Sequence, residues 1–401
     1  MCADVAGPDP LPLEGVVVAD FSRVLAGPYA TMLLADLGAT VVKVERPDSG
    51  DDTRSWGPPW TEHSSAYFES VNRGKRSVVL DLADPDGQRA ARDLVRRADV
   101  LVENFRPGAL ARYGLDFDSA AALNPSLVYA SISGFGGEGG AHLPGYDFVV
   151  QALGGLMSIT GDPDGPPTKV GVAVVDVLTG KDAALGIMAA LRHRDRTGTG
   201  QHVEVNLLSS LLSSLVNQMS ALQTTGAAPQ RMANRHPSIA PYETLRCEDA
   251  FLAVAVGNDA QFRRLTEALG LVGMAEDPRF ATNAERVAHR EELVRHLENV
   301  LGARTAVDWQ ERLQRIGIAC GQVNDLSRAV DYAESLGLRP TVDPGDGGVA
   351  QARMPIDFSA TGSAAATAPP RLGEHTDEVL AWLSDTESAP LPPTASRRIP
   401  S

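Results

Sequence analysis

The stretch Ala39-Thr-Val-Val-Lys-Val-Glu45 is dominated by β-branched residues and has the length of one β-strand. Similar runs recur between residues 15 and 135, and amphipathic segments separate several of them. Strands that alternate with helices in this way are typical of an α/β fold with a largely parallel sheet. We expect the other strands at residues 15–20, 77–81, 99–103 and 127–132, and helices at 28–37, 88–97 and 107–113.

The pattern changes in the second half of the chain. A strand at 202–205 precedes a long Leu/Ser-rich helix to about residue 222, and a hairpin at 242–256 precedes helices near 259–269, 291–301 and 305–315. We therefore expect a large α/β domain at 1–200, a linker helix within 201–228, a smaller α+β domain at 229–325 and a return to the large domain at 326–383. The stretch 384–401 is rich in Pro, Ser and Thr and is expected to form a mobile tail.

Composition excludes several classes of protein. The formal charge of −15 opposes binding to nucleic acid or anionic lipid, and no run approaches the ~18 apolar residues of a membrane-spanning helix. Three widely spaced cysteines without a CxxC pair indicate neither a disulfide framework nor a structural zinc site. These features, and an N-terminus without the pattern of a secretion signal, predict a cytoplasmic protein.

The commonest catalytic motifs are absent. Gly134-Phe-Gly136-Gly-Glu-Gly139 fits GxGxxG, but the breaker sequence His142-Leu-Pro-Gly145 follows where a dinucleotide fold needs a helix. We therefore expect a permissive turn that delivers Tyr146 and Asp147. The sequence contains no phosphate-binding P-loop, no HExxH or other metal-ligand cluster and no GxSxG elbow, so carboxylates are left as the reactive groups.

Asp176 is the leading candidate among these carboxylates. It ends the apolar run Val170-Gly-Val-Ala-Val-Val175 and precedes a helical pattern that ends near Thr197-Gly-Thr-Gly200, so we expect it at a strand-to-helix turn. Backbone N–H groups at such a turn favour the ionised carboxylate, which can attack an activated acyl group. The alternative is an Asp that only stabilises its own helix.

Two arginines follow predicted strands at the edge of the sheet where α/β folds bind ligands. Arg23 follows the strand that ends at Asp20, and Arg46 follows the strand that ends at Glu45. Both guanidinium groups are therefore candidates to bind the same phosphates.

Taken together, these motifs resemble family III coenzyme A transferases, from about residue 12 to residue 383. The stretches that carry the resemblance are Asp20-Phe-Ser-Arg-Val-Leu-Ala-Gly-Pro28, Leu37-Gly-Ala-Thr-Val-Val-Lys-Val-Glu-Arg-Pro47, Asn72-Arg-Gly-Lys-Arg76, Asp99-Val-Leu-Val-Glu-Asn-Phe-Arg-Pro-Gly108, Pro144-Gly-Tyr-Asp147, Asp176-Val-Leu-Thr-Gly180, Thr197-Gly-Thr-Gly-Gln201 and Gly373-Glu-His-Thr-Asp-Glu378. The resemblance implies a Rossmann-like large domain built from both chain ends, a smaller inserted domain and an interlocked homodimer.

The resemblance also implies the site. Asp176 is the nucleophile, forming an anhydride with the acyl group and then a thioester with coenzyme A, which is a substrate and not a permanently bound cofactor. Leu25 stands where some relatives carry a glutamine near the acyl group. The implied coenzyme A contacts are Arg23, Val24, Leu25, Ala26, Arg46, Lys75, Asn104, Phe105, Arg112 and Tyr146.

Two other functions stay open at this point. Alpha-methylacyl-CoA racemases resemble the first 200 residues but carry a His acid–base where this chain has Tyr146, whose phenol is a poor base at neutral pH. A non-catalytic CoA-binding protein would use Asp176 only as a helix cap. The stretch Ala233-Asn-Arg-His-Pro-Ser-Ile-Ala-Pro-Tyr242 lacks the glycine run of oxalate-using relatives, which favours a small dicarboxylic acid as the substrate. Arg235 and His236 are candidates to bind the distal carboxylate of this acid. The alternative is that they fix an interdomain turn.

Overall fold

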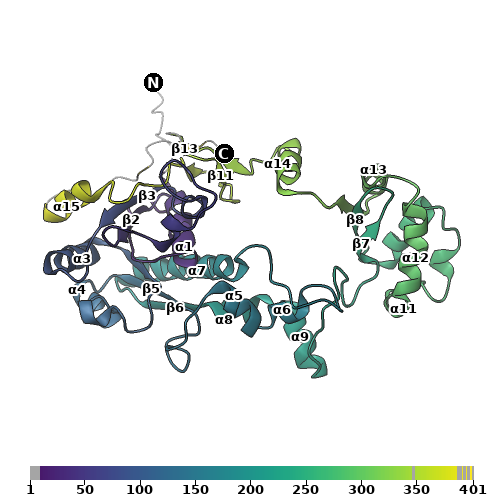
Figure 1. Cartoon of the computed structure of the whole chain (residues 1–401), viewed down its shortest axis with the longest axis horizontal. Coiled ribbons are helices and arrows are strands. Elements are labelled where there is room, and N and C mark those ends of the chain that lie inside the picture. Colours follow the sequence, from purple (N-terminus) through teal and green to yellow (C-terminus); the bar gives the residue numbers. More distant parts are fainter. Residues whose placement is uncertain (1–9, 346–347, 386–390, 392–393, 395–397, 400–401) are drawn as a thin grey trace. The chain divides into compact units, whose positions relative to one another are not determined.

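The computed structural model describes residues 10–345, 348–385, 391, 394 and 398–399 (Figure 1). Contacts within the chain divide it into two compact units. The larger unit contains the described residues up to Leu156, Val170–Thr224 and the described residues from Arg339 onward. The smaller unit contains Met157–Lys169 and Thr225–Leu338. Residues 201–224, where we expected a linker, thus group with the larger unit, and residues 326–338 group with the smaller one.

A six-stranded parallel sheet forms the centre of the larger unit. Its strand order is β3-β2-β1-β4-β5-β6, and every neighbouring pair is parallel. This arrangement confirms the α/β fold that the alternating runs predicted. The strands are β1 Val17–Asp20, β2 Thr40–Glu45, β3 Lys75–Val79, β4 Val100–Glu103, β5 Val128–Ser133 and β6 His202–Asn206.

Helices cover both faces of this sheet. One face packs against α1 Ala26–Asp36, α5 Asp147–Leu153, α7 Val174–Thr197 and α8 Leu207–Ser214. The other face packs against α3 Pro85–Arg97, α4 Phe117–Leu123 and α15 Thr376–Ser384. Because both faces are covered, the central strands β1 and β4 consist mostly of apolar residues.

The strand order reverses at β1, which lies between β2 and β4. The chain leaves β1 toward β2 and β3, and then returns to place β4 on the other side of β1. Open α/β sheets bind their ligands in the crevice outside the carboxyl ends of the two strands at such a reversal. We therefore expect the ligand-binding site in the loops that follow β1 and β4.

The last helix completes the larger unit. Figure 1 shows α15, in yellow, beside α3. The Arg76 Nε of β3 donates to the Glu378 carboxylate at 3.1 Å, and the backbone N–H of Val79 donates to Thr376 Oγ1 at 3.1 Å. The larger unit therefore contains segments from both ends of the given sequence.

Part of the expected mobile tail contacts the larger unit. The Thr40 hydroxyl donates to the carbonyl of Leu391 at 3.0 Å, and the Thr394 hydroxyl donates to the carbonyl of Gly74 at 3.0 Å. The short strand β13 Arg398–Ile399 pairs with β12 Ser363–Ala364. The mobility of the stretch 384–401 stays a prediction. The rest of the stretch, at 386–390, 392–393, 395–397 and 400–401, lies outside the described residues.

The smaller unit contains a three-stranded antiparallel sheet in the order β7-β8-β9. One face of this sheet packs against helices to form a separate core. The elements are β7 Tyr242–Arg246, β8 Phe251–Ala255, α10 Asp259–Ala268, η3 Met274–Glu276, α11 Asn283–Ala288, α12 Arg290–Leu301, α13 Ala306–Arg315, β9 Ala319–Gln322 and α14 Leu326–Ser335.

Three sequence expectations were wrong locally. Residues 170–173 form no strand and lie outside the sheet, and Val172 is 54% exposed. Residues 107–113 form a turn followed by the 3-10 helix η2 Ala111–Tyr113, since the positive φ of 79° at Gly108 does not fit an α-helix. The long helix to 222 is interrupted at Val216, where φ is 25°, and continues as α9 Val216–Thr225.

The remaining short elements lie outside the six-stranded and three-stranded sheets. They are η1 Asp52–Ser55, α2 Ala66–Glu69, α6 Leu156–Ile159, β10 Thr341–Val342 and β11 Gln351–Ala352. Within the described ranges, none of the helices has both the length and the apolar character needed to cross a membrane.

Candidate active site

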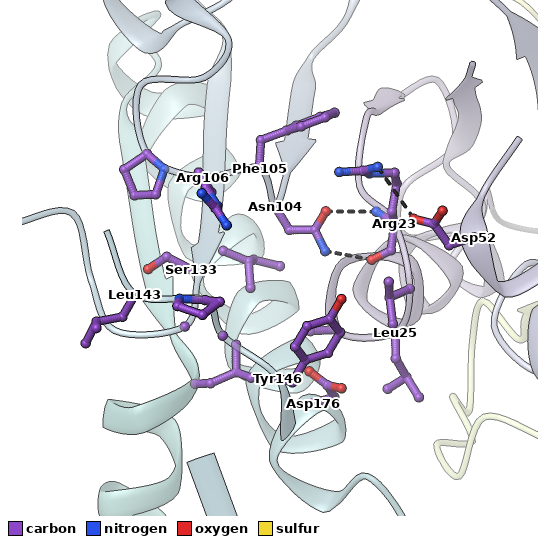
Figure 2. Close-up of a pocket in the computed structure, with 18 residues that line it drawn as sticks. Arg23, Leu25, Asp52, Asn104, Phe105, Arg106, Ser133, Leu143, Tyr146 and Asp176 are labelled. Atoms are coloured by element: carbon purple, nitrogen blue, oxygen red, sulfur yellow. Dashed lines mark hydrogen bonds and ion pairs between the residues drawn. The ribbon is translucent and has the colours of Figure 1, made fainter. Parts of the chain in front are cut away.

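The loops after β1 and β4 are joined by a pair of hydrogen bonds. The backbone N–H of Arg23 donates to Asn104 Oδ1 at 2.8 Å, and Asn104 Nδ2 donates back to the Arg23 carbonyl at 2.6 Å (Figure 2). An amide side chain can satisfy both backbone groups at once because it carries a donor and an acceptor. Asn104 therefore fixes the first loop at the point where the strand order reverses.

Val24, the next residue in that loop, adopts a conformation that is unusual for a β-branched side chain. Its φ is 72°, in the left-handed region. The Val24 backbone N–H points at both carboxylate oxygens of Asp51, at 3.3 Å each. Asp51 is itself buried and paired with the buried Lys43 ammonium at 2.9 Å. Burial opposes the ionised form of Asp51, but the Lys43 charge and the hydrogen bonds from Lys43 and Thr53 together outweigh it and lower the pKa of Asp51 to about 2. A permanently ionised Asp51 thus holds the Val24 backbone.

Asp176 lies in the first turn of α7, and a glycine one turn later brings this helix close to α1. A Cβ atom on Gly180 would lie 2.7 Å from the carbonyl oxygen of Ala26, so only glycine allows this approach. The approach places Asp176 beside the start of α1. In Figure 2 the Asp176 carboxylate lies below Tyr146, with Leu25 beside them.

The helix N-terminus does not stabilise the Asp176 carboxylate in the way the sequence led us to expect. Asp147 Oδ1 accepts hydrogen bonds from the backbone N–H groups of Val175 at 2.7 Å and Asp176 at 3.2 Å. Burial, and then the negative charge of Asp147, raise the pKa of Asp176 from 3.8 to about 7. The expectation that local N–H groups favour ionised Asp176 was therefore wrong, because Asp147 takes these donors.

The Asp147 side chain is held in turn by Gln151. Gln151 is fully buried, and its Nε2 donates to Asp147 Oδ2 at 2.6 Å. Its Oε1 accepts from the backbone N–H of Val170 at 2.9 Å. One buried amide therefore ties the irregular 170–173 segment and the start of α7 to α5.

The glycine-rich loop after β5 positions Tyr146. A Cβ added to Gly134 would lie 2.6 Å from the Cα of Gly145, so the two ends of this loop touch through their backbones. Tyr146 follows immediately and is 59% exposed. The structure thus has a turn where GxGxxG suggested one, and Tyr146 after this turn lines the same cavity as Ser133 (Figure 2).

These elements enclose a cavity of about 240 Å³ in the larger unit. It contains eight of the eleven residues that the resemblance assigned to catalysis and coenzyme A binding. The eight are Arg23, Val24, Leu25, Ala26, Asn104, Phe105, Tyr146 and Asp176.

A second cavity, of about 200 Å³, adjoins the first and contains two more expected residues, Arg46 and Arg112. The two cavities share Arg23 and Phe105, and the Arg23 guanidinium carbon lies 4.8 Å from the centre of the Phe105 ring. The second cavity also has apolar walls from Phe21, Val44, Leu80, Leu82 and Tyr113. Three arginines beside apolar and aromatic walls suit a ligand that carries both phosphates and a flat ring.

Lys75 is the expected residue that the structure does not bring to either cavity. Its ammonium is fully buried and donates to Asp20 Oδ2 at 3.0 Å, to the Pro28 carbonyl at 2.9 Å and to Asn72 Oδ1 at 3.0 Å. Burial lowers the pKa of Lys75 to about 8, although Asp20 opposes this change. With its three N–H donors engaged inside the protein, Lys75 links β3 to β1 and to the start of α1.

Arg235 and His236 belong to the smaller unit. Arg235 forms ion pairs with Glu291 at 2.6 Å and with Glu243 at 3.6 Å. His236 Nδ1 accepts from the backbone N–H of Ser238 at 3.1 Å, and its ring lies 5.1 Å from the ring of Tyr242. Both side chains hold a local turn, and their role in substrate binding stays a prediction.

Sequence reasoning missed several residues of the first cavity. The missed residues are Asp52, Arg106, Pro107, Ile132, Ser133, Gly134, Leu143, Pro144, Gly145 and Leu207. The position of Arg106 and Pro107 directly after Phe105 was a usable signal, whereas nothing in the sequence placed Asp52 near Arg23. Among the residues that the structure describes, no group of three or more His, Cys, Asp or Glu side chains is arranged to hold a metal ion.

Comparison with known protein families gives one match over most of the chain. The model of CoA-transferase family III matches residues 13–376. The resemblance that the motifs suggested is confirmed by this match.

Three curated relatives carry names of CoA-transferases. Succinate--glutarate CoA-transferase of Agrobacterium fabrum is 44% identical, and the match covers 95% of this chain and 98% of the relative. Acetyl-CoA:oxalate CoA-transferase of Acetobacter aceti is 40% identical over 87% of this chain and 89% of the relative. Succinyl-CoA:glutarate CoA-transferase of Mus musculus is 39% identical over 92% of this chain and 86% of the relative.

Two solved structures share the fold. A CAIB/BAIF family protein from Brucella suis has a TM-score of 0.85 at 42% identity, covering 94% of this chain and all of that chain. The protein Rv3272 from Mycobacterium tuberculosis has a TM-score of 0.82 at 31% identity, covering 92% of this chain and 99% of that chain.

Proposed function

The chain belongs to CoA-transferase family III, and from this membership we propose that it transfers coenzyme A from an acyl-CoA donor to a small dicarboxylic acid through covalent intermediates on Asp176. The observation that carries the mechanism is the placement of the Asp176 carboxyl group in a cavity that also contains Arg23, Asn104 and Tyr146. Burial leaves the Asp176 carboxylate poorly solvated and therefore reactive, and its pKa of about 7 still leaves a large share of the group ionised at neutral pH.

The first half of the reaction forms two intermediates in sequence. An Asp176 oxygen attacks the thioester carbonyl of the donor, the carbon–sulfur bond breaks, and a mixed anhydride and a CoA thiolate result. The thiolate then attacks the Asp176 carbonyl carbon of the anhydride. The donor acid leaves as its carboxylate, and coenzyme A stays attached to Asp176 as a thioester.

The second half reverses these steps with a different acid. The acceptor carboxylate attacks the Asp176 thioester, which gives a new anhydride and a CoA thiolate. The thiolate attacks the acceptor carbonyl, so acyl-CoA is released and the Asp176 carboxylate is restored. Each step forms one acyl bond as another breaks, so the energy of the thioester is retained when water is excluded.

The two adjoining cavities suit the two ends of coenzyme A. We assign the phosphates and the adenine ring to the second cavity, with Arg46, Arg112 and Arg23 as the cations. The pantetheine arm then passes Phe105 and Asn104 into the first cavity, where Val24 and Leu25 flank the approach to Asp176. Leu25 has no polar atom in its side chain, so the polarisation of the thioester carbonyl must come from backbone N–H groups or from Tyr146.

The proposed acid substrate rests on the relatives. Their names pair coenzyme A with succinate, glutarate and oxalate, which are all dicarboxylic acids. These names favour transfer over the racemase and over the non-catalytic CoA-binding protein. A role for Arg235 and His236 in gripping the distal carboxylate stays part of this proposal.

We also propose that two copies of the chain associate as a homodimer in the cytoplasm. Several large apolar side chains of the larger unit are exposed in the single chain, and a surface of this kind is typical of a protein interface. They are Phe148, Val149 and Leu153 of α5 and Leu185 of α7, which are 57%, 40%, 67% and 71% exposed. Light scattering on the purified protein measures the mass and decides between one copy and two.

Trapping of the intermediates tests the mechanism. The protein is incubated with succinyl-CoA, quenched with hydroxylamine or borohydride, and digested for mass spectrometry. We expect a modification on Asp176 that is absent from Asp176→Ala, while the variant still folds and binds coenzyme A. Modification of a different residue, or unmodified Asp176 with every donor that is turned over, contradicts the mechanism. Exchange of an alpha proton into deuterated water would instead favour racemisation.

A further inference from the structure

An acidic side chain stands between two of the arginines that we assign to the phosphates. Arg23 Nη1 lies 3.5 Å from Asp52 Oδ2, and Arg46 Nη2 is hydrogen-bonded to Asp52 Oδ1. The Asp52 carboxylate therefore contacts two guanidinium groups at once, one through each oxygen. Asp52 itself lines the first cavity, and Arg46 lines the second (Figure 2 shows the Arg23–Asp52 contact).

The backbone next to Asp52 is fixed. Asp52 begins the 3-10 turn η1, and the preceding residue, Asp51, caps this turn by accepting from the backbone N–H of Thr53 at 3.0 Å. Asp51 is buried and bound to Lys43. The backbone of Asp52 is thus held by these contacts, while its side chain is 39% exposed to water.

Among the described residues, Asp52 is the carboxylate that pairs with each of these two arginines. Arg46 Nε donates to the uncharged Ser49 Oγ at 2.7 Å. Arg23 stacks on Phe105, and its Nε is buried without a hydrogen-bond partner in the described part of the chain. A buried guanidinium N–H that lacks an acceptor marks a place where an anionic ligand oxygen would be bound.

We propose that Asp52 is an internal substitute for a ligand phosphate: it holds Arg23 and Arg46 together in the empty protein, and an anionic group of the incoming ligand displaces it. This inference rests on the proposed function, because it takes coenzyme A as the ligand. Exposed ion pairs are weak, so the phosphate, which offers more acceptor oxygens and more charge, replaces the carboxylate. Asp52 therefore reduces the affinity for coenzyme A and makes binding depend on the phosphates.

The substitution Asp52→Asn tests this competition, because it keeps the shape and removes the charge. We measure dissociation constants by calorimetry for coenzyme A, dephospho-CoA and pantetheine. The expected result is that Asp52→Asn binds coenzyme A about threefold to tenfold more tightly, the scale set by one or two exposed ion pairs, and binds pantetheine unchanged. The gain should shrink as salt is added, since ions screen exposed charges.

A matched control removes the same charge elsewhere. Asp86 forms an exposed ion pair with Arg89 on α3, outside both cavities, so Asp86→Asn should leave all three dissociation constants unchanged. A double variant adds a second check. With Arg46→Gln present, Asp52→Asn should give a smaller gain for coenzyme A, because one of the two competing contacts is already gone.

Each other outcome overturns the inference. Weaker binding of coenzyme A by Asp52→Asn would mean that Asp52 orders the arginines for the ligand instead of competing with it. An equal gain for pantetheine, or an equal gain from Asp86→Asn, would mean that the effect is not local to the phosphates. If the unaltered protein binds no coenzyme A, the proposed function fails first, and this result is distinct from the others.

Discussion

The Asp147 carboxylate accepts a hydrogen bond from the backbone N–H of Asp176 at 3.2 Å, so one acidic residue caps the helix that carries the other. This arrangement has two effects on Asp176. It orients the start of α7, and it adds a negative charge that disfavours a second one nearby. The pKa of about 7 for Asp176 follows from burial and from this charge.

Substitution of Asp147 by Asn should shift the pH dependence of the reaction. The amide of Asp147→Asn keeps an oxygen that can accept from the α7 backbone, but the negative charge is gone, so the pKa of Asp176 should fall. The attacking form is the ionised carboxylate, and kcat/KM rises as pH rises through the pKa of the free enzyme. We expect the rise to move to lower pH. At pH 6, kcat/KM as a fraction of its plateau value should then increase about threefold to tenfold. The control Asp182→Asn removes an exposed charge from the same helix and should not move the profile. An unshifted Asp147→Asn profile would contradict this account.

Substitution of Asp176 by Asn should stabilise the protein while stopping turnover. The folded-state pKa of Asp176 lies above its ordinary value of 3.8, so the folded protein disfavours the ionised form that prevails in the unfolded chain. This cost is largest above pH 7 and disappears below about pH 4. We expect Asp176→Asn to raise the free energy of unfolding at pH 8 by about 1–2 kcal/mol, after allowance for partial solvent access. Urea unfolding at pH 8 and at pH 4 measures the difference, and an equal gain at both values would exclude the electrostatic cause.

Substitution of Gly145 by Ala should damage the site through its backbone. The new Cβ would lie 2.5 Å from the Cα of Gly134, so the loop must open and Tyr146 must move. We expect kcat/KM to fall about 10-fold to 100-fold, the usual scale for a misplaced positioning group. Gly139 lies in the same loop with no atom within 4 Å of an added Cβ, so Gly139→Ala should retain activity. Similar activities for the two variants would show that the Gly134–Gly145 approach does not position the site.

Substitution of Lys75 by Met should affect stability and not ligand affinity. The change leaves the buried Asp20 without its ion-pair partner, and breaking such a buried ion pair costs about 3–5 kcal/mol of stability. Thermal unfolding measures this loss. Calorimetry at low temperature, where the variant is still folded, should give an unchanged dissociation constant for coenzyme A. A large loss of affinity in the folded variant would restore Lys75 as a ligand contact.

Substitution of Arg112 by Gln should weaken acyl-CoA binding with little change in kcat. Arg112 lines the second cavity, away from the reacting carboxyl, so its contacts are the same in the ground state and in the transition state. We expect KM for the acyl-CoA donor to rise about 10-fold, which corresponds to one charge-assisted contact. The exposed Arg89 on α3 gives a matched control, Arg89→Gln, for which KM should not change. A fall in kcat with constant KM would contradict the assignment.

The sequence was a good guide to the sheet and to the part of the first cavity that the loops after β1 and β4 form. Runs of β-branched residues mark strands because both faces of the sheet are covered, and the residues directly after β1 and β4 meet because the strand order reverses there. Arg23, Asn104 and Phe105 are therefore found together. The strand-like run at 170–175 misled us, since apolar character alone does not distinguish a strand from an irregular segment that precedes a helix.

The electrostatic state of the site depends on contacts between residues far apart in the sequence. Asp147 and Asp176 are 29 positions apart, and only the fold shows that the first caps the helix of the second. The position of Lys75 could not be inferred from the sequence for a similar reason. Its strand begins at Lys75 itself and directs the ammonium toward Asp20, 55 positions earlier, so a residue that the resemblance assigned to coenzyme A forms an ion pair in the interior.

The contact of α15 with β3 and α3 has a consequence for how the chain is made. All six strands of the large sheet lie before residue 207, so they are synthesised well before α15. One sheet face then stays partly uncovered until Val379, Trp382 and Leu383 of α15 have been made. The nascent protein therefore carries exposed apolar surface during the synthesis of the segment between β6 and α15, and we expect chaperones to engage it during that interval.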